Sequence, residues 1–507
     1  MTSKRSEQTN TEATSLEAVI NRYDRQELIQ GWNQKKLTET SVTVAGGDVV
    51  AQYVVMALSA LGFGYIEVYD KGTREIQNFS NGFINNDSDN INFSNYRSET
   101  ISEFAKKINP LIDSRGITLD LSRTNNLSVL NKPNIVIDAT NDPASKKELI
   151  DYCIDNKCLF ISVSSSDNIG KLGVYNPNNR KNRVEDSVMM NNLLFTEMND
   201  KHQDPSTGMM VSALAADEAR KYVMPMNNEK LIEDIIIHNM HSNRRFDSKM
   251  NKTITGEDDF SDKKVLMVGA GALGNFVGLG LSLSNLGELV IIDKDIVEST
   301  NLNRQPFFYN SVGREKVPAL IAQLKKINPE KKYEGITDFI SLGFDYLFKK
   351  NKPDLIIDCV DNDKARALLN YYSTKYQIPM ISSATRYNSG HVNISVPGKT
   401  SCLNCQKDID KYALEGDHAR ASQSCIYAPQ TSVITSNMTI AGMVVCEAKT
   451  ILNPEKYGEP IGFELKYISE DEYRVGTLPL NKEYCECHND TEKIEKWPKV
   501  MGKLYEK

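Results

Sequence analysis

The amino-acid sequence predicts an α/β protein made of two tandem, doubly wound sheets. In the second half of the chain, short apolar segments alternate with stretches of helical periodicity. Near-continuous apolar strands between helices are typical of a mostly parallel sheet that helices cover on both faces. The first half repeats the same series of motifs at an offset of about 220 residues, and a fixed offset of this kind is typical of a duplicated unit.

The elements expected in the second half follow one another as strands and helices. Buried strands are expected at Val265–Val268, Glu288–Ile292, Leu355–Ile357 and Met380–Ser383. Helices are expected at Gly274–Leu286, Lys316–Ile327 and Thr435–Leu452, and the last of these has Val211–Val223 as its counterpart in the first half. The lengths separate the two classes, because apolar runs of about 4 to 8 residues favour strands and longer periodic runs favour helices.

Recurring segments support the duplication and divide the chain. Lys106–Pro110 and Lys325–Pro329 share the sequence Lys-Lys-Ile-Asn-Pro, and Asn134–Asn141 resembles Asp354–Asp361. The repeat predicts four parts, which are a disordered tail over residues 1–20, a first domain over 21–242, a linker over 243–262 and a second domain over 263–507.

Composition excludes several classes of protein. The net charge of −7 over 507 residues gives no basic footprint for nucleic acid. No window approaches the run of about 18 apolar residues that a membrane-spanning helix needs, and the polar segment Met1–Leu16 does not resemble a signal peptide. The nine cysteines, several in close pairs, favour metal or thiol chemistry in a reducing compartment. We therefore expect a cytoplasmic protein with neither nucleic-acid nor membrane partners.

A glycine-rich loop opens the second half. Gly269, Gly271 and Gly274 follow the expected strand Val265–Val268, and the acidic residue Asp293 ends the next strand. Glycines at this spacing let the backbone approach phosphate at a helix N-terminus. An acidic side chain about 20 residues further on suits a ribose hydroxyl. The spacing predicts a Rossmann-like nucleotide site.

Further polar residues extend this site. Asn301, Arg304, Gln305 and Lys316 follow in the sequence, and Asp361 comes after the third expected strand. Arg304, Lys316 and Asp361 fit a triphosphate and its metal ion, because cations offset phosphate charge and carboxylates hold Mg²⁺. A nicotinamide or flavin oxidoreductase would leave these three residues without a task. The sequence therefore predicts an enzyme that uses ATP and Mg²⁺.

In the first half this site is degenerate. Ala45 is expected in the place of Gly269 and Val50 in that of Gly274, while Asp48 puts a negative charge where phosphate should lie. The remaining positions align as Arg304 with Asn81, Asp361 with Asn141 and Lys316 with Arg97. We therefore expect a retained fold with an inactive nucleotide site.

This series of residues resembles the adenylating superfamily that includes ubiquitin-activating enzymes and the bacterial ThiF and MoeB proteins. The resemblance covers most of residues 20–490 and is stronger in the second half. It implies ATP-dependent activation of the C-terminal carboxylate of a ubiquitin-like protein or peptide as an acyl-adenylate, with release of pyrophosphate. It also implies that Asp293 binds the ribose, that Arg304 and Lys316 hold the triphosphate, and that Asp361 holds Mg²⁺. The full set of nucleotide contacts implied is Gly269, Gly271, Gly274, Asp293, Asn301, Arg304, Gln305, Lys316 and Asp361.

The superfamily usually works as a dimer in which an arginine near one N-terminus reaches the ATP of the other subunit. The segment Arg22–Gln26 resembles that motif and assigns the role to Arg25, whose counterpart in the second half is Ser248. The half with the degenerate site thus keeps the donated arginine, and the half with the intact site has lost it. The resemblance implies a fused pseudo-dimer with one active site that can function as a monomer. The alternative is that Arg25 lies on a solvated helix.

Four cysteines resemble the structural zinc site of the superfamily. Cys402 and Cys405 form a C-x-x-C pair with good spacing for tetrahedral zinc, and Cys485 and Cys487 form a distant second pair. The second pair reads C-x-C-H where the superfamily has C-x-x-C, so either Cys487 or His488 is the fourth ligand. The first half offers Asn182 and Glu185 in place of the first pair and should bind no zinc.

Cys425 lies beyond the first zinc pair, where superfamily members that form a thioester or persulfide carry their cysteine. The glycine that usually follows is absent, so a covalent role and an inert loop thiol are equal alternatives. A thioester on Cys425 would imply a conjugating enzyme or a sulfur acceptor as a further partner.

Two other functions remain open. One is adenylation of a ribosomally made precursor peptide in natural-product biosynthesis, in which Cys425 need not take part. The other is a catalytically silent binding scaffold, against which the intact nucleotide-site residues of the second half argue.

Overall fold

The computed structural model describes eleven segments of the chain, which are residues 22–73, 82–84, 95–121, 127–166, 168–179, 203–227, 229–246, 258–415, 431–471, 474–480 and 484–505. The expected disordered tail and Cys425 lie outside these described residues. Ser248, Asn81, Asn182 and Glu185 lie outside them as well.

The first half forms a seven-stranded sheet in the order β3-β2-β1-β4-β5-β6-β7. The strands β1 to β5 pair in parallel, and β6 and β7 extend the sheet in antiparallel orientation. The strands are β1 (Ser41–Ala45), β2 (Tyr65–Tyr69), β3 (Asp113–Ile117), β4 (Ile135–Asp138), β5 (Leu159–Ser166), β6 (Ile169–Tyr175) and β7 (Ile236–Asn239). The α-helices are α2 (Asp24–Glu27), α3 (Gln34–Thr38), α4 (Val49–Leu61), α5 (Arg97–Ile108), α6 (Pro143–Asn156) and α8 (Pro205–Val223).

The second half repeats this plan with an eight-stranded sheet in the order β10-β9-β8-β11-β12-β13-β14-β15. Its first five strands in this order are parallel and the last three are antiparallel. The strands are β8 (Phe260–Val268), β9 (Leu286–Ile292), β10 (Lys332–Ile336), β11 (Leu355–Asp358), β12 (Met380–Arg386), β13 (Ser389–Ser395), β14 (Phe463–Ile468) and β15 (Val475–Pro479). The α-helices are α9 (Ala272–Leu283), α10 (Lys316–Ile327), α11 (Asp345–Lys349), α12 (Asp363–Tyr376), α13 (Leu403–Lys407), α14 (Ile409–Glu415), α16 (Ile434–Leu452), α17 (Pro454–Tyr457) and α18 (Thr491–Met501).

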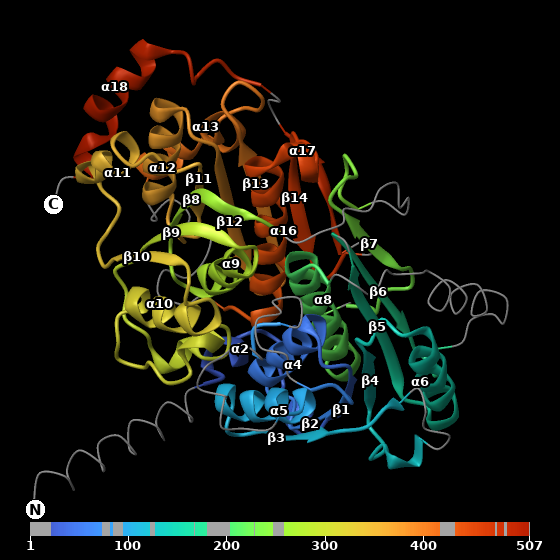
Figure 1. The fold of residues 1–507 in the computed structure, drawn as a ribbon. Coiled ribbons are helices and arrows are strands. Elements are labelled where there is room, and N and C mark those ends of the chain that lie inside the picture. The colour runs from blue at the N-terminus through green and yellow to red at the C-terminus, as the bar shows by residue number, and fades with distance from the viewer. Residues whose placement is uncertain are drawn as a thin grey trace, which may run out of the picture.

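The fold class predicted from the sequence is confirmed as two tandem, doubly wound α/β units that form a pseudo-dimer (Figure 1). The expected helix at Lys316–Ile327 has the observed bounds, and each expected strand lies inside an observed one. The helix expected at Gly274–Leu286 in fact ends at Leu283, because Ser284 and Asn285 turn the chain into β9. The antiparallel ends of both sheets carry no distinct sequence pattern and were not expected.

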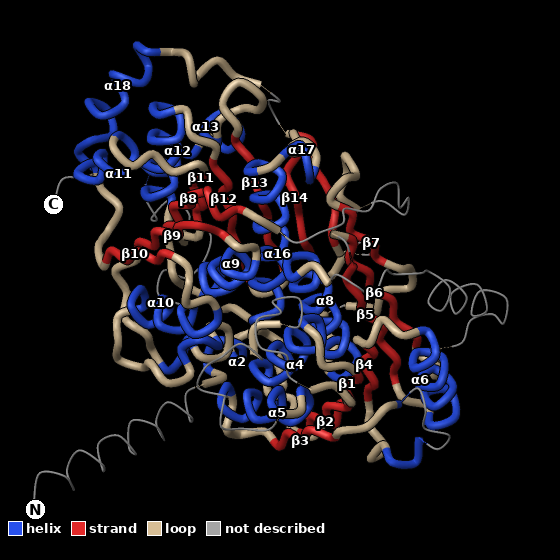
Figure 2. Tube along the Cα trace, viewed as in Figure 1, coloured by secondary structure: helices blue, strands red, loops and turns tan. Residues whose placement is uncertain are grey.

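Helices α4, α8, α9 and α16 lie between the two sheets (Figure 2). Helix α8 packs against α4 and α16, and α16 packs against α9. Every residue of α4 is buried, which is typical of a helix enclosed between layers. The largest hydrophobic cluster contains residues of both halves, including Val55, Met210, Leu279 and Val444. The two units therefore share one core.

Two glycines allow α16 to lie close to its neighbours. A Cβ atom on Gly442 would lie 2.7 Å from Cβ of Met210 on α8, and one on Gly280 of α9 would lie 2.7 Å from Cγ2 of Val445. Both distances are shorter than contact between carbon atoms allows. A larger residue at either position would push the helices apart.

Two buried arginine–glutamate pairs cross the interface in opposite directions. Arg245, which follows β7, places Nε 2.5 Å from Oε1 of Glu447 on α16. Arg474, which precedes β15, places Nε 3.1 Å from Oε1 of Glu218 on α8. Both arginines have a positive φ, of 60° and 55°, and all four side chains are buried. Each half thus donates one arginine to the central helix of the other.

No helix among the described residues is both long enough and apolar enough to cross a membrane.

Replacing Glu447 with Gln should lower the free energy of unfolding by about 3 kcal/mol, because removing one partner leaves a buried charge without compensation. Denaturant unfolding would measure the change. The matched control is Glu39→Gln, since Glu39 forms an exposed pair with Lys35 at 3.6 Å, and it should cost less than about 0.5 kcal/mol. Equal effects of the two substitutions would contradict a structural role for the buried pair.

Candidate functional site

The glycine loop Gly269–Gly274 joins β8 to α9 with little free space around two of its glycines. A Cβ on Gly269, whose φ is +105°, would lie 2.5 Å from the carbonyl oxygen of Cys359. A Cβ on Gly274 would lie 2.0 Å from the carbonyl oxygen of Gly269. A Cβ on Gly271 would meet nothing within 4 Å. Gly271 also precedes the first turn of α9, so the open side of the loop presents helix N–H groups that can bind an anion.

Asp293 and Lys316 lie beside this loop. Oδ2 of Asp293 accepts a hydrogen bond of 2.6 Å from the backbone N–H of Ala270, and Oδ1 accepts one of 2.7 Å from the N–H of Asp295. Lys316 begins α10, and its Nζ lies 2.9 Å from Oδ2 of the half-exposed Asp295. The structure thus brings the acidic strand end and the lysine to the edge of the sheet where the loop lies.

The segment Asn301–Gln305 brings a second cation to this edge. Asn301 forms a reciprocal cap with Glu298, which fixes the start of the segment. Nη1 of Arg304 donates to the carbonyl oxygen of Thr300 at 2.8 Å. Burial, and then repulsion from the nearby Arg25 of the first half, lower the pKa of Arg304 to about 10. Gln305 is buried, and its Oε1 has no hydrogen-bond partner among the described residues.

Helix α2 of the first half supplies this neighbour. It packs against the 3₁₀ turn η5 (Ser299–Asn301) of the second half. The guanidinium of the buried Arg22 donates to the carbonyl oxygen of Leu302 at 3.4 Å, and burial lowers the pKa of Arg22 to about 10. Nε of Arg25 is buried without a hydrogen-bond partner among the described residues. The geometry therefore collects guanidinium groups from both halves with little negative charge to compensate them, which suits an anionic ligand.

Asp361 follows β11 at the same edge and is exposed. No hydrogen bond or ion pair holds its carboxylate among the described residues, whereas the neighbouring Asn362 caps α12 by accepting from the N–H of Ala365 at 2.9 Å. Three residues earlier, at the end of β11, the carboxylate of the buried Asp358 accepts from Nε of Arg366 at 3.2 Å. An exposed carboxylate on a fixed loop fits a hard divalent cation such as Mg²⁺.

The expected alignment of the glycine loops is wrong by one residue. Ala45 pairs with Tyr69 in the first sheet as Val268 pairs with Ile292 in the second. Gly46, with a φ of +119°, therefore corresponds to Gly269. The sequence allows two alignments of the loops, because the small residues Ala45, Gly46 and Gly47 follow one another at the end of β1. The strand pairing selects one of them.

Two substitutions follow from the corrected register. Asp48 takes the place of Gly271, and Ala51, not Val50, takes that of Gly274. The negative charge of Asp48 therefore lies at the open side of the loop.

Ion pairs occupy this position in the first half. Arg97, which begins α5 as Lys316 begins α10, forms an ion pair with Asp48. Its Nε and Nη2 also donate to the two carboxylate oxygens of Asp70 at 2.9 and 3.0 Å. Asn141, the counterpart of Asp361, is buried and carries no charge. These pairs already engage Arg97, which is therefore not available to a phosphate. The inactive site stays a prediction that they support.

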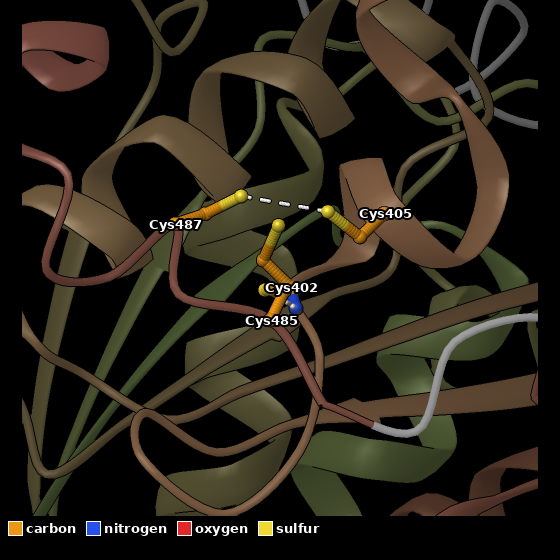
Figure 3. A group of neighbouring side chains, drawn as sticks. All are labelled: Cys402, Cys405, Cys485 and Cys487. Atoms are coloured by element: carbon orange, nitrogen blue, oxygen red, sulfur yellow. Dashed lines mark hydrogen bonds between the residues drawn. The ribbon is translucent and has the colours of Figure 1, made fainter.

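The four expected zinc ligands come together although Cys402 and Cys485 are more than 80 positions apart in the sequence (Figure 3). The sulfur atoms of Cys402, Cys405, Cys485 and Cys487 all lie within 4.8 Å of one another. Zinc–sulfur bonds of about 2.3 Å in a tetrahedron place sulfur atoms about 3.8 Å apart, so the set fits zinc. The cluster contains Cys487 and not His488.

The thiol of Cys405 depends on a metal for its charge. Burial, followed by the neighbouring sulfur of Cys487, raises the pKa of Cys405 to about 11, so without a metal this thiol is neutral at pH 7. Nζ of Lys493 on α18 lies 3.3 Å from the sulfur of Cys487 and would offset thiolate charge. A zinc ion would therefore join the segment after β13 to the start of α18 and release protons on binding.

Two other cysteines in this half are packing residues. Burial raises the pKa of Cys446 well above its ordinary value, and the same holds for Cys359 beside the glycine loop. A raised pKa keeps both thiols protonated at neutral pH, which disfavours a nucleophilic role.

A model of the ThiF family matches residues 23–254 and again residues 249–489. The chain belongs to the ThiF family. Ubiquitin-like modifier-activating enzyme 5 of Caenorhabditis briggsae is 27% identical over 293 residues, which are 54% of this chain and 65% of the relative. The protein of the same name from Drosophila mojavensis is 28% identical over 255 residues, which are 46% of this chain and 61% of the relative. The chain spans less than two thirds of the length of these two relatives.

Solved structures of the protein MccB are also similar to this ThiF-family chain. The crystal structure of E. coli MccB with AMPCPP and MccA has 25% sequence identity and a TM-score of 0.38, and covers 44% of this chain and 66% of that chain. The structure of the microcin C7 biosynthetic enzyme MccB with N-formylated MccA has 24% identity and a TM-score of 0.39, with the same coverage.

Several residues of the site were not expected from the sequence. Arg22 belongs to the same short motif as Arg25, and Asn303 lies inside the segment around Arg304. Both residues therefore lie in motifs that the sequence identified, but no role was predicted for either. Asn275 donates to the carbonyl oxygens of Ala270 and Gly271 at 3.1 and 3.0 Å. Its polar side chain in an otherwise apolar helix is the one signal that could have identified it.

Replacing Cys487 with Ser should abolish most zinc binding, because a tetrahedral site loses one of its four ligands. His488→Ala should retain about one zinc ion per chain, as should the matched control Cys359→Ser. Elemental analysis of the purified proteins measures the zinc content. Zinc loss in His488→Ala with retention in Cys487→Ser would instead assign His488 as the ligand.

Proposed function

We propose that this ThiF-family protein is an enzyme that uses ATP to adenylate the C-terminal carboxylate of a ubiquitin-like protein at one active site in its second half. The observation that carries the proposal is the contact of helix α2 of the first half, which carries Arg25, with the segment of the second half that carries Arg304. The open glycine loop of the second half adds a place for phosphate. The ion pairs of Arg97 at the equivalent place in the first half support a single site.

The residues of the second half would divide the binding of ATP among them. The glycine loop and the first turn of α9 would hold phosphate oxygens, and Asp293 would accept hydrogen bonds from the ribose hydroxyls. Asn301 and Gln305 would complete the nucleotide contacts. The capped start of the segment at Asn301 and the unpartnered Oε1 of Gln305 support these two assignments.

The cations would act on the reaction itself. A carboxylate oxygen of the substrate attacks the α-phosphorus, the bond to the bridging oxygen breaks, and pyrophosphate leaves with the electron pair. Arg25, Arg304 and Lys316 would offset the repulsion between the carboxylate and the triphosphate and the charge on the leaving group. Asp361 would hold Mg²⁺, which supplies further positive charge at the phosphates when bound.

The relatives support a protein substrate, since both are named as enzymes that activate a ubiquitin-like modifier. A short ribosomally made peptide is the alternative substrate, and the chemistry at the carboxylate would be the same. The described cysteines form no disulfide, which supports our proposal of a cytoplasmic setting.

ATP–pyrophosphate exchange with candidate ubiquitin-like proteins and peptides should depend on both halves. Asp361→Ala and Arg25→Ala should each lower the exchange rate about 100-fold or more, because each removes a group that stabilises developing charge. Matched controls are Asp262→Ala and Arg115→Ala, whose side chains are 73% and 65% exposed, and these should exchange normally.

Exchange that survives Arg25→Ala would reject the donated arginine and leave the active site in place. Failure of the unaltered protein to bind ATP–Mg²⁺ in calorimetry would favour the silent scaffold. Binding at two sites per chain would contradict an inactive first half.

Cys425 is proposed as the residue that takes over the activated carboxylate as a thioester. Its sulfur would attack the acyl carbon, AMP would leave, and the thiol proton would pass to solvent. Cys425→Ala should then abolish a reductant-sensitive conjugate with the substrate and leave pyrophosphate exchange unchanged, as denaturing gels with and without thiol would show. The control is Cys359→Ser. Full product formation by Cys425→Ala would favour the peptide alternative.

A further inference from the structure

Asn303 lies at a junction between the two halves and is completely buried. Its Nδ2 donates to Oε1 of Gln26 in the first half at 3.1 Å and to the carbonyl oxygen of Ser432 at 3.1 Å. Its Oδ1 accepts from Nη1 of Arg304 at 3.0 Å. Both N–H groups and the oxygen of the amide are thus in use, so its orientation is fixed.

Gln26 is fixed in the same way from the other side. Its Nε2 donates to the carbonyl oxygen of Leu61 at 3.0 Å and to Oε1 of Gln34 at 2.7 Å. Both acceptors belong to the first half. Because the two N–H groups are engaged there, only the Oε1 of Gln26 can face the second half, and only a donor can lie opposite it.

These contacts form a continuous path from the end of α4 to Arg304. Leu61 orients Gln26, Gln26 orients Asn303, and Asn303 holds the guanidinium of Arg304. Loss of the Asn303 amide would remove a donor from the buried Oε1 of Gln26 and from the partly buried carbonyl oxygen of Ser432. It would also release one bond of Arg304, and lost hydrogen bonds are costly in a buried setting.

We propose that Asn303 is a positioning residue that couples helix α2 to Arg304, so that Arg25 and Arg304 reach one anion together. The proposal rests on the proposed function, because it takes the triphosphate of ATP as that anion. Gln26 acts with Asn303, and a change at either residue has the same consequence for Arg304.

The test is the affinity of the full-length chain for ATP–Mg²⁺, measured by calorimetry. Asn303→Ala and Gln26→Ala should each weaken binding about tenfold, which is the effect of losing one charge-linked hydrogen bond. The double substitution should weaken binding no further, because the two residues act as one unit. The matched control Asn351→Ala, at an exposed position of the second half, should bind as the unaltered protein does.

The thermal midpoint of each variant distinguishes a loss of positioning from a loss of folding, because a positioning residue should change ATP affinity more than stability. Gln26→Ala tests the same junction without a substitution in the second half. Unchanged ATP affinity in both single variants would overturn the inference and leave the proposed function standing. A double variant that loses the product of the two single effects would overturn the coupling. If the unaltered protein bound no ATP–Mg²⁺, the proposed function would fail and the inference with it.

Discussion

The candidate site depends on the fixed position of one half against the other, and buried arginine–glutamate pairs fix it. Arg245 pairs with Glu447, and Arg474 pairs with Glu218 in the reverse direction. Buried charges are costly unless their partners lie in place, so a shifted interface would deprive buried charges of both halves of a partner. The pairs therefore favour the arrangement of the two halves in which all four side chains meet their partners. That arrangement brings Arg25 to Arg304.

The corresponding sheet edges of the two halves differ in the ion pairs that hold their cations. The first residue of α5 is Arg97, which pairs with Asp48 and Asp70. The first residue of α10 is Lys316, which pairs only with a half-exposed aspartate among the described residues. The carboxylates of Asp48 and Asp70 therefore neutralise the cation of the first edge, whereas in the second half the proposed function assigns Lys316 and the N–H groups at the start of α9 to an anionic ligand.

Local sequence patterns predicted those helices and strands whose formation depends on the periodicity of neighbouring apolar residues. The parallel strands and the helix Lys316–Ile327 follow from apolar periodicity. The approach of Cys485 to Cys402 followed from the resemblance to a known family. Hydrogen bonds between distant residues leave no such pattern, and so the junction at Asn303 could not be predicted. The predicted alignment of the first glycine loop was wrong for a related reason. Two local alignments are equally good, and only the pairing of distant strands decides between them.

The whole chain carries a negative net charge, whereas the candidate site gathers positive charge. The chain carries a net charge of −7, yet burial lowers the pKa of Arg22 and of Arg304 to about 10, as expected for cations that are removed from water. An anion bound there would supply the missing counterion to groups from both halves. Its binding free energy would therefore add to the stability of the interface as well as of the site. The bound anion would pair with cations of both halves, as the buried glutamates do. Binding of the ligand would therefore stabilise the same contact between the halves that forms its site.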